Sequence, residues 1–145
     1  INRNAKNGLV CSGSVLEVEE STITGNKVKH EHITELPFFT HLFVLFWMDR
    51  IKSDHSMLSY PRGDRSLPLT GVLASRGPSH PNAIGLAVVE LMDRNETTLK
   101  VRRLDAYNGT PVLDIKPYDH YDMFPDIKAP KWFHTRAMAR NADLG

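Results

Sequence analysis

The sequence predicts an all-β fold, a small closed or partly open β-barrel or sandwich with short helical segments and an irregular C-terminal arm. Short runs rich in Val, Ile, Phe and Trp recur along the 145-residue chain, and such residues favour strands. Clusters of Gly, Pro, Asn and Asp separate these runs and indicate turns. Little of the chain shows the apolar spacing of an amphipathic helix.

The first third of the chain predicts one strand, one turn and one short helical segment. Residues 14–19 alternate roughly between apolar and polar side chains, which is typical of a strand with one face in water. Residues 21–29 are polar and contain a Gly-Asn pair, which indicates a turn or hairpin. Residues 32–39 are expected to form one helical turn that ends before Pro37, because proline disfavours helical backbone in the preceding residue.

The rest of the chain supplies most of the expected sheet. Residues 41–48 are rich in Phe, Val and Trp and predict a central strand that is buried on both faces. Residues 51–69 are long, polar and proline-bearing, which predicts a surface loop. A turn over residues 93–96 is expected to join two further strands as a hairpin. The further expected strands are residues 71–75, 84–92, 97–104 and 112–115.

Length and composition predict a single domain over residues 1–145, and residues 119–145 are interpreted as a C-terminal arm. A hydrophobic fraction of 41% and a charged fraction of 24% are ordinary for a globular domain. The arm contains prolines and aromatic residues and is expected to be irregular, with a brief helix over residues 134–141.

Net charge, cysteine content and the length of apolar runs limit the binding partners and the cellular location that we expect for the protein. The formal net charge is +1, so no overall field draws the chain to nucleic acid or to a membrane, although a local basic patch is compatible with it. Cys11 is the one cysteine, so no internal disulfide is expected and the cytoplasm is the expected location. No apolar run approaches the roughly 20 residues that a membrane span needs, so no membrane partner is expected.

Two loops concentrate backbone constraint. Residues 71–86 place an arginine, two prolines and several glycines between apolar runs. Prolines fix φ and glycines permit positive φ, so such a segment specifies one rigid path. Residues 104–118 repeat the pattern. Because small-molecule sites often lie on rigid loops held by a sheet, we expect the two loops to share one pocket.

Charged residues in or beside these loops have a functional and a structural interpretation each. Arg76 could present its planar guanidinium to a carboxylate or phosphate, or it could bond carbonyl groups of its own loop. Asp105 could accept hydrogen bonds from ribose hydroxyls or an amino group. Asp49 and Arg50 directly follow the central strand and form either a surface ion pair or part of a cleft. The pattern alone leaves these alternatives open.

Familiar cofactor and nucleophile motifs are absent from the sequence. There is no Gly-x-Gly-x-x-Gly, P-loop or Gly-x-Ser-x-Gly, so a Rossmann-type methyltransferase or dehydrogenase is not expected. His30 and His32 flank Glu31, but no third ligand is apparent, so we expect a solvated face and no metal. The tripeptide from Arg62 to Asp64 is interpreted as a chance match to an adhesion motif.

Taken together, the two loops resemble those of the TsaA-like, or TrmO-type, family. The loop around Arg76 is similar to the family pattern Gly-Val-Phe-Ala-Thr-Arg-Ser-Pro-x-Arg-Pro-Asn-Pro-Ile-Gly-Leu. Residues 39–50 resemble the family's central strand, and residues 5–8 resemble a weakened form of its Pro-Arg-Gln-Gly motif. The positions that match in the two loops are Gly71, Val72, Ala74, Arg76, Pro78, Pro81, Asn82, residues 84–86, residues 104–105 and residues 109–118.

The resemblance extends over about residues 5–118 and implies that these form the core of the domain. It implies a β-barrel that binds S-adenosyl-L-methionine without a Rossmann sheet, as a homodimer with the cofactor near the subunit interface. It further implies a tRNA substrate, methylated at the exocyclic amino nitrogen of threonylcarbamoyl-adenosine beside the anticodon. It assigns no catalytic residue and no metal. Cofactor contacts are implied at Lys6, Asn7, Asp49, Arg50, Arg76, Leu86, Asn108, Gly109, Thr110 and Pro111, with Asp105 as a supporting candidate.

Five positions depart from the family pattern. Lys6 and His80 stand where the family has arginines, and either change loses the bidentate guanidinium. Gly77 replaces serine, Ala83 replaces proline and Asn108 replaces aspartate. Two alternatives therefore stay open: a non-catalytic dimer that binds S-adenosylmethionine or a nucleoside, and a methyltransferase that acts on a small molecule or another RNA. A lack of basic surface around the pocket mouth would favour the small acceptor.

Overall fold

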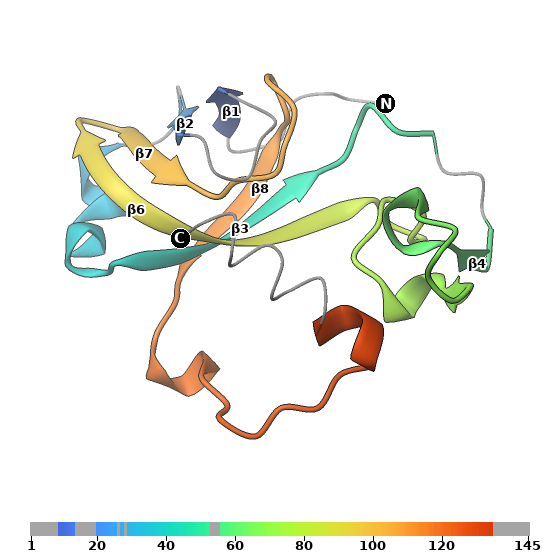
Figure 1. The fold of residues 1–145 in the computed structure, drawn as a ribbon. Coiled ribbons are helices and arrows are strands. Elements are labelled where there is room, and N and C mark those ends of the chain that lie inside the picture. The colour runs from blue at the N-terminus through green and yellow to red at the C-terminus, as the bar shows by residue number, and fades with distance from the viewer. Residues whose placement is uncertain (1–8, 14–19, 26, 28, 53–55, 135–145) are drawn as a thin grey trace.

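A curved antiparallel sheet of six strands forms the body of the protein (Figure 1), and the computed structural model describes residues 9–13, 20–25, 27, 29–52 and 56–134. The edge strands of the sheet, β1 and β8, come into contact, so the sheet curls into a partly open barrel. The predicted all-β fold is confirmed. In spatial order the strands are β1 (Leu9–Gly13), β2 (Glu20–Gly25), β7 (Thr98–Arg102), β6 (Ile84–Asn95), β3 (His41–Trp47) and β8 (Val112–Pro117).

Alternating burial along the strands builds the hydrophobic core. On β3 the side chains of Leu42, Val44 and Phe46 are buried, whereas those between them face outward and are half-buried or exposed. The central strand is where the sequence predicts it, but its second face is less covered than expected. Each fully buried aliphatic side chain contributes about 1.5–3 kcal/mol to stability. Other strands and loops complete the core with Ile23, Val89, Leu99, Val101, Leu104, Ala106 and Val112.

The hairpin between β6 and β7 is confirmed, with a tighter turn than the predicted residues 93–96. β6 continues to Asn95, and Glu96 takes a positive φ of 50° in the turn. The pairing register shifts around Met92, which is an extra residue on β6. Such a bulge bends the strand and increases its twist, which helps the sheet to curl.

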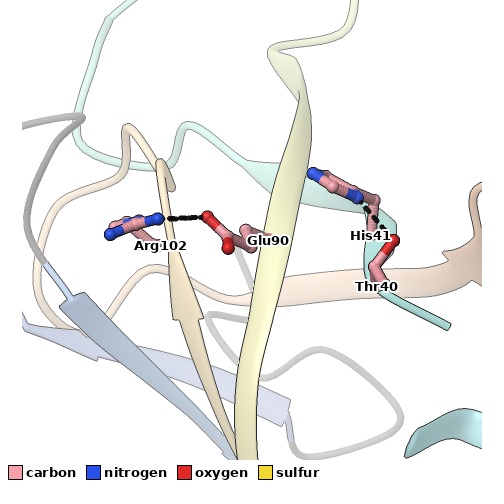
Figure 2. Close-up of polar contacts among 4 residues, drawn as sticks. All are labelled: Thr40, His41, Glu90 and Arg102. Carbon is pink, nitrogen blue, oxygen red and sulfur yellow. Dashed lines mark hydrogen bonds and ion pairs between the residues drawn. The ribbon is translucent and has the colours of Figure 1, made fainter. Parts of the chain in front are cut away.

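A charge pair lies across this hairpin on its outer face, before the bulge. Glu90 lies opposite Arg102, and both Nε and Nη2 of Arg102 donate to Glu90 Oε2 (Figure 2). On the other side of β6, Glu90 lies opposite His41, whose Nδ1 forms a 2.8 Å hydrogen bond with Thr40 Oγ1. Three neighbouring strands therefore carry polar side chains in one row, and the Glu90–Arg102 pair links two of them.

The surface loop predicted over residues 51–69 contributes to a small hairpin. The strand expected over residues 71–75 is confined to its first residue, because the chain then turns. The Val72 N–H donates to the carbonyl oxygen of Met57, and Ser75 N–H donates to that of Val72, both at 3.1 Å. The elements of this segment are β4 (Leu58–Ser59), η3 (Pro61–Gly63), β5 (Thr70–Gly71) and η4 (Val72–Ala74).

The structure differs from the sequence prediction in two further segments. The polar segment predicted as a turn begins as strand β2, whose alternate side chains Ser21 and Ile23 are buried; a strand needs only one apolar face. The helical turn predicted over residues 32–39 is two 3-10 turns, η1 (His30–Ile33) and η2 (Leu36–Phe38). η2 includes Pro37, because the first positions of a helical turn need no N–H donor. The strand predicted over residues 14–19 lies outside the described residues.

Beyond β8 the chain forms the irregular arm that the sequence predicts (Figure 1). Its short helix η5 (His120–Asp122) is capped by Asp119, whose carboxylate accepts from the Tyr121 N–H at 2.7 Å. A helical turn follows over residues 131–134, and most of the helix predicted over 134–141 lies outside the described residues. Within the described ranges, no helix has both the length and the apolar character to cross a membrane.

Candidate functional site

A cleft of about 990 Å³ lies between the curved sheet, the β4–β5 hairpin and the two constrained loops. Its floor comes from β3 and β6, where Phe46 and Gly85 are cross-strand partners. The helical turn of the arm adds Trp132 and Phe133, whose ring centroids are 5.6 Å apart. A cleft of this size is large enough for a nucleoside with substituents.

The first loop holds Arg76 at the cleft on a constrained backbone. Ser75 Oγ donates to the carbonyl oxygen of Val72 at 2.9 Å, and His80 Nε2 donates to the carbonyl oxygen of Ser75 at 2.8 Å. These bonds close the loop on both sides of Arg76, whose side chain lines the cleft. His80 is engaged within the loop and is not among the cleft-lining residues, so it does not replace the arginine of the resembled pattern as a ligand contact.

The second loop lines the cleft with residues 105–107 and with Thr110. Leu104 is fully buried in the core, whereas Asp105 and Tyr107 line the cleft. A tight turn follows, in which the Thr110 N–H donates to the carbonyl oxygen of Tyr107 at 3.0 Å. Gly109 in this turn has a φ of 83°, a conformation that glycine adopts without strain. The Asn-Gly pair therefore sets the path of the loop.

Arg50 connects the end of the central strand to the second loop. Its Nη2 donates to the carbonyl oxygen of Asn108, and its Cζ lies 5.6 Å from the centroid of the Tyr107 ring. A Cβ atom on Gly109 would lie 3.6 Å from the same Nη2, an ordinary van der Waals contact, so the positive φ and not the guanidinium favours glycine here. Arg50 therefore shapes the loop, in addition to the cofactor contact that the sequence predicts for it.

The structure brings most of the predicted site residues to this cleft. The carbonyl oxygen of Asn108 accepts from Arg50 at its edge, and the carbonyl oxygen of Pro111 accepts from the Trp47 N–H at 2.9 Å. Gly109 lies between them in the same turn. Lys6 and Asn7 lie outside the described residues. Six of the predicted residues line the cleft: Asp49, Arg50, Arg76, Leu86, Asp105 and Thr110.

Several cleft residues were not predicted individually. Arg62 belongs to the tripeptide interpreted as a chance match, yet it lines the cleft, and its Nη2 lies 4.0 Å from Asp105 Oδ2. Arg62 and Gly63 both have positive φ, so the Pro-Arg-Gly turn is a third constrained corner. The Pro-Arg-Gly sequence at residues 61–63 is the signal in the sequence that could have indicated this turn. The unpredicted cleft residues include Tyr60, Arg62, Arg65, Arg103, Tyr107, Trp132 and Phe133.

The cleft is basic, although the chain as a whole is nearly neutral. Its described lining holds five arginines and two aspartates, a formal excess of three positive charges. Clefts lined by one sign of charge concentrate ligands of the opposite sign. The charged residues are Arg50, Arg62, Arg65, Arg76 and Arg103, with Asp49 and Asp105.

The histidines of η1 do not belong to this cleft. His30 and Glu31 are exposed, and His32 Nδ1 accepts from the Lys29 N–H at 2.9 Å. In the part of the chain that the structure describes, no three or more His, Cys, Asp or Glu side chains gather as metal ligands would.

Residues 5–123 match the family model of the tRNA-methyltransferase O N-terminal domain. The crystal structure of TrmO from Pseudomonas aeruginosa superposes with a TM-score of 0.67 at 24% identity, over 88% of this chain and 62% of that chain. A second crystal structure of TrmO gives a TM-score of 0.66 at 21% identity, over 99% of this chain and 80% of that one. These structures show that the fold is shared.

Sequence relatives carry the names of S-adenosyl-L-methionine-binding proteins and of tRNA methyltransferases. A probable S-adenosyl-L-methionine-binding protein of Archaeoglobus fulgidus is 52% identical over 79 residues, 54% of this chain and 21% of that protein. The tRNA (adenine(37)-N6)-methyltransferase of Homo sapiens is 32% identical over 137 residues, 88% of this chain and 30% of that protein. This chain covers only 21%, 58% and 54% of the length of three archaeal relatives.

Proposed function

Because the chain belongs to the tRNA-methyltransferase O N-terminal domain family, we propose that it is an S-adenosylmethionine-dependent methyltransferase acting on adenosine beside the tRNA anticodon. The acceptor atom is the exocyclic amino nitrogen, and the preferred base carries a threonylcarbamoyl group. The observation that carries the proposal is one cleft bordered by both constrained loops and five arginines. The proposed location is the cytoplasm, in keeping with the lone Cys11.

The side chains at the cleft fit S-adenosyl-L-methionine chemically. The cofactor carries a carboxylate, for which Arg76 offers a planar donor pair. It also carries an ammonium group and ribose hydroxyls, for which Asp49 and Asp105 offer acceptors. The half-exposed ring of Tyr107 can pack against adenine. When bound, the cofactor supplies a methyl group activated by its sulfonium centre.

The protein itself positions the reactants and excludes water from the cleft. Hydrogen bonds within the protein hold the Arg76 loop and the Arg50-bound second loop, so both loops need little reorganisation to bind a ligand. Phe46, Trp132 and Phe133 present apolar surface to the same cleft and displace water from it. An amino nitrogen can release its proton after attack on the methyl group begins. No dedicated base is needed, and no histidine is found in the described lining of the cleft.

The charge of the cleft supports a nucleic acid as the acceptor. A small neutral acceptor would gain nothing from five arginines, of which a methyl donor can engage only some. An RNA brings phosphates close to the acceptor base, and arginine is well suited to bind them. The basic lining therefore favours tRNA over the small-molecule alternative.

One observation favours a second candidate, a dimer that binds the cofactor without catalysis. His80 stands where the family pattern has arginine, and its side chain bonds the carbonyl oxygen of Ser75 instead of lining the cleft. The cleft therefore lacks the arginine that the family pattern has at this position, while Arg76, Leu86 and Gly109 among the positions proposed for the cofactor match that pattern. This candidate predicts binding of the methyl donor with no transfer to RNA.

The proposed assembly is a homodimer formed through the outer face of β3 and β6. Trp47, Ile84 and Leu86 are 44%, 46% and 43% exposed there, and Trp47 lies opposite Ile84. Leu86 also lines the cleft, so a second copy on this face would border the site. Replacing Trp47 and Ile84 with Glu should give monomers in analytical ultracentrifugation, and a dimer that persists would rule out this face.

The test of the proposed function is incubation with a methyl-labelled donor and bulk tRNA, followed by nucleoside analysis. We expect label in N6-methylated adenosine derivatives, and more of it with tRNA that carries the threonylcarbamoyl group. Donor binding by calorimetry without any labelled nucleoside would instead support the non-catalytic candidate. Label in small molecules of a tRNA-free extract, but none in tRNA, would support a small acceptor.

A further inference from the structure

We propose that Tyr60, backed by Arg65, is the surface on which the acceptor base stacks. The inference rests on the proposed RNA acceptor and deepens it, because it assigns the base to one wall of the cleft. Tyr60 lines the cleft and keeps 37% of its surface exposed. The Cζ atom of Arg65 lies 5.9 Å from the centroid of its ring. One side of the ring is thus supported by a cation.

The turn that carries Tyr60 is built from local hydrogen bonds. The Gly63 N–H donates to the carbonyl oxygen of Tyr60 at 2.9 Å. Asp64 Oδ1 then accepts from both the N–H and the hydroxyl of Ser66, at 2.9 and 2.6 Å. Pro61 is buried and fixes the backbone directly after Tyr60. A ring on such a turn loses little conformational entropy when a flat ligand binds to it.

An aromatic ring beside arginines is suited to a nucleotide. Every base has a flat π-face, so one ring can stack on it, and a nearby cation strengthens the contact. The same turn presents Arg62 to the cleft, and Arg103 faces the cleft from another segment. A base on Tyr60 would place its own phosphates within reach of positive charge, which a lone ring could not offer.

The wall of the cleft that carries Tyr60 differs in its charged residues from the wall proposed for the cofactor. The aspartates of the cleft, Asp49 and Asp105, come from the end of β3 and from the second loop, beside the Tyr107 ring. The β4–β5 hairpin presents to the cleft only Arg62 and Arg65 as charged residues. A methyl donor needs acceptors for its ammonium group and ribose hydroxyls, in addition to the cation for its carboxylate, whereas an RNA strand needs only cations for its phosphates. The hairpin therefore suits the RNA.

The experiment is a double-mutant cycle between the ring and the base. Wild-type protein and Tyr60→Ala are titrated with two anticodon stem-loop RNAs, in the presence of S-adenosylhomocysteine. One RNA has adenosine beside the anticodon, and the other is abasic at that position. We expect Tyr60→Ala to weaken binding of the first RNA about 5- to 100-fold and to leave binding of the abasic RNA unchanged. Tyr60→Phe should bind both as the wild type does.

Controls separate a local loss from a misfolded hairpin. Tyr121→Ala is the matched control, because Tyr121 is 92% exposed and does not line the cleft; it should bind as the wild type does. Tyr60→Leu keeps apolar bulk without a π-face and should behave like Tyr60→Ala, with the wild-type affinity for the methyl donor.

Three outcomes overturn the inference: equal weakening of both RNAs, no weakening of either, or weakened donor binding in Tyr60→Leu. Failure of the wild type to bind either RNA also overturns it. The methylation assay reports separately on the proposed function. If Tyr60→Ala methylates tRNA as well as the wild type does, only the stacking role is overturned. If binding depends on the base but no methylation occurs, only the proposed activity is overturned.

Discussion

The ring of Phe46 lies across Gly85, its cross-strand partner on β6. A Cβ atom built on Gly85 would come within 2.2 Å of a Phe46 ring carbon, a distance that no real side chain tolerates. The ring therefore requires glycine at this position, and in return it covers a stretch of bare backbone. Because both residues line the cleft, this contact forms part of its floor.

Replacing Gly85 with Ala should destabilise the fold. The added methyl group collides with the ring, so Phe46 must leave its position or the two strands must separate. Overpacking of this kind costs about 1–3 kcal/mol of the free energy of unfolding, measurable by urea denaturation. Gly71→Ala is the control, because a Cβ there meets nothing within 4 Å. Equal loss in the two variants would mean that Phe46 is not the cause.

Local chemistry explains which parts of the fold the sequence predicted. The apolar run of β3 and the Pro- and Gly-bounded loops carry their signal in neighbouring residues, and both were predicted. The Phe46–Gly85 contact and the meeting of β1 with β8 join residues far apart in sequence, so no window of sequence contains them. β2 was predicted as a turn because only Ile23 marks its apolar face strongly.

The same distinction applies to the site. Arg76 and Asp105 stand in constrained loops, which made them candidates from the sequence. Tyr60, Arg62 and Arg65 belong to a segment whose strands have two residues each, too short for any periodic pattern. Only the folded chain brings that segment to the second loop, where Arg62 approaches Asp105. Its place in the cleft therefore depends on tertiary structure.

Replacing Arg50 with Lys should loosen the second loop. Lysine keeps the charge, but it lacks the planar group that bonds the Asn108 carbonyl oxygen and also lies beside the Tyr107 ring. We expect a loss of about 1 kcal/mol in unfolding free energy and a lower affinity for the methyl donor in calorimetry. Arg94→Lys, outside the cleft, should change neither quantity. Wild-type values in Arg50→Lys would show that charge alone is sufficient.

Replacing Arg76 with Ala should weaken binding of the methyl donor. The guanidinium is the donor proposed for the cofactor carboxylate, and a hydrogen bond between charged groups contributes about 1.5–3 kcal/mol. The expected loss is about 10- to 100-fold in affinity by calorimetry, with little change in unfolding because Arg76 is exposed. Unchanged donor affinity would remove Arg76 from the site and restore its structural interpretation.

The Glu90–Arg102 pair should contribute modestly to stability. Its side chains are 34% and 42% exposed, so water screens the pair, and we expect a coupling of about 0.5–1 kcal/mol in a double-mutant cycle of Glu90→Gln and Arg102→Gln. The more exposed pair of Lys116 and Asp114 should couple less strongly. A coupling in 1 M salt as large as in dilute buffer would contradict an electrostatic origin.

Binding of tRNA should depend on salt through the arginines of the cleft. Each phosphate neutralised by a side chain adds about 0.7–0.9 to the slope of log affinity against log salt. Arg62→Gln and Arg103→Gln should each reduce the slope by about that amount, and Arg103→Gln should leave donor affinity unchanged. Arg94→Gln, outside the cleft-lining set, should keep the full slope. If all three variants showed the wild-type slope, the RNA backbone would have to lie elsewhere, and the basic lining would no longer favour tRNA over a small acceptor.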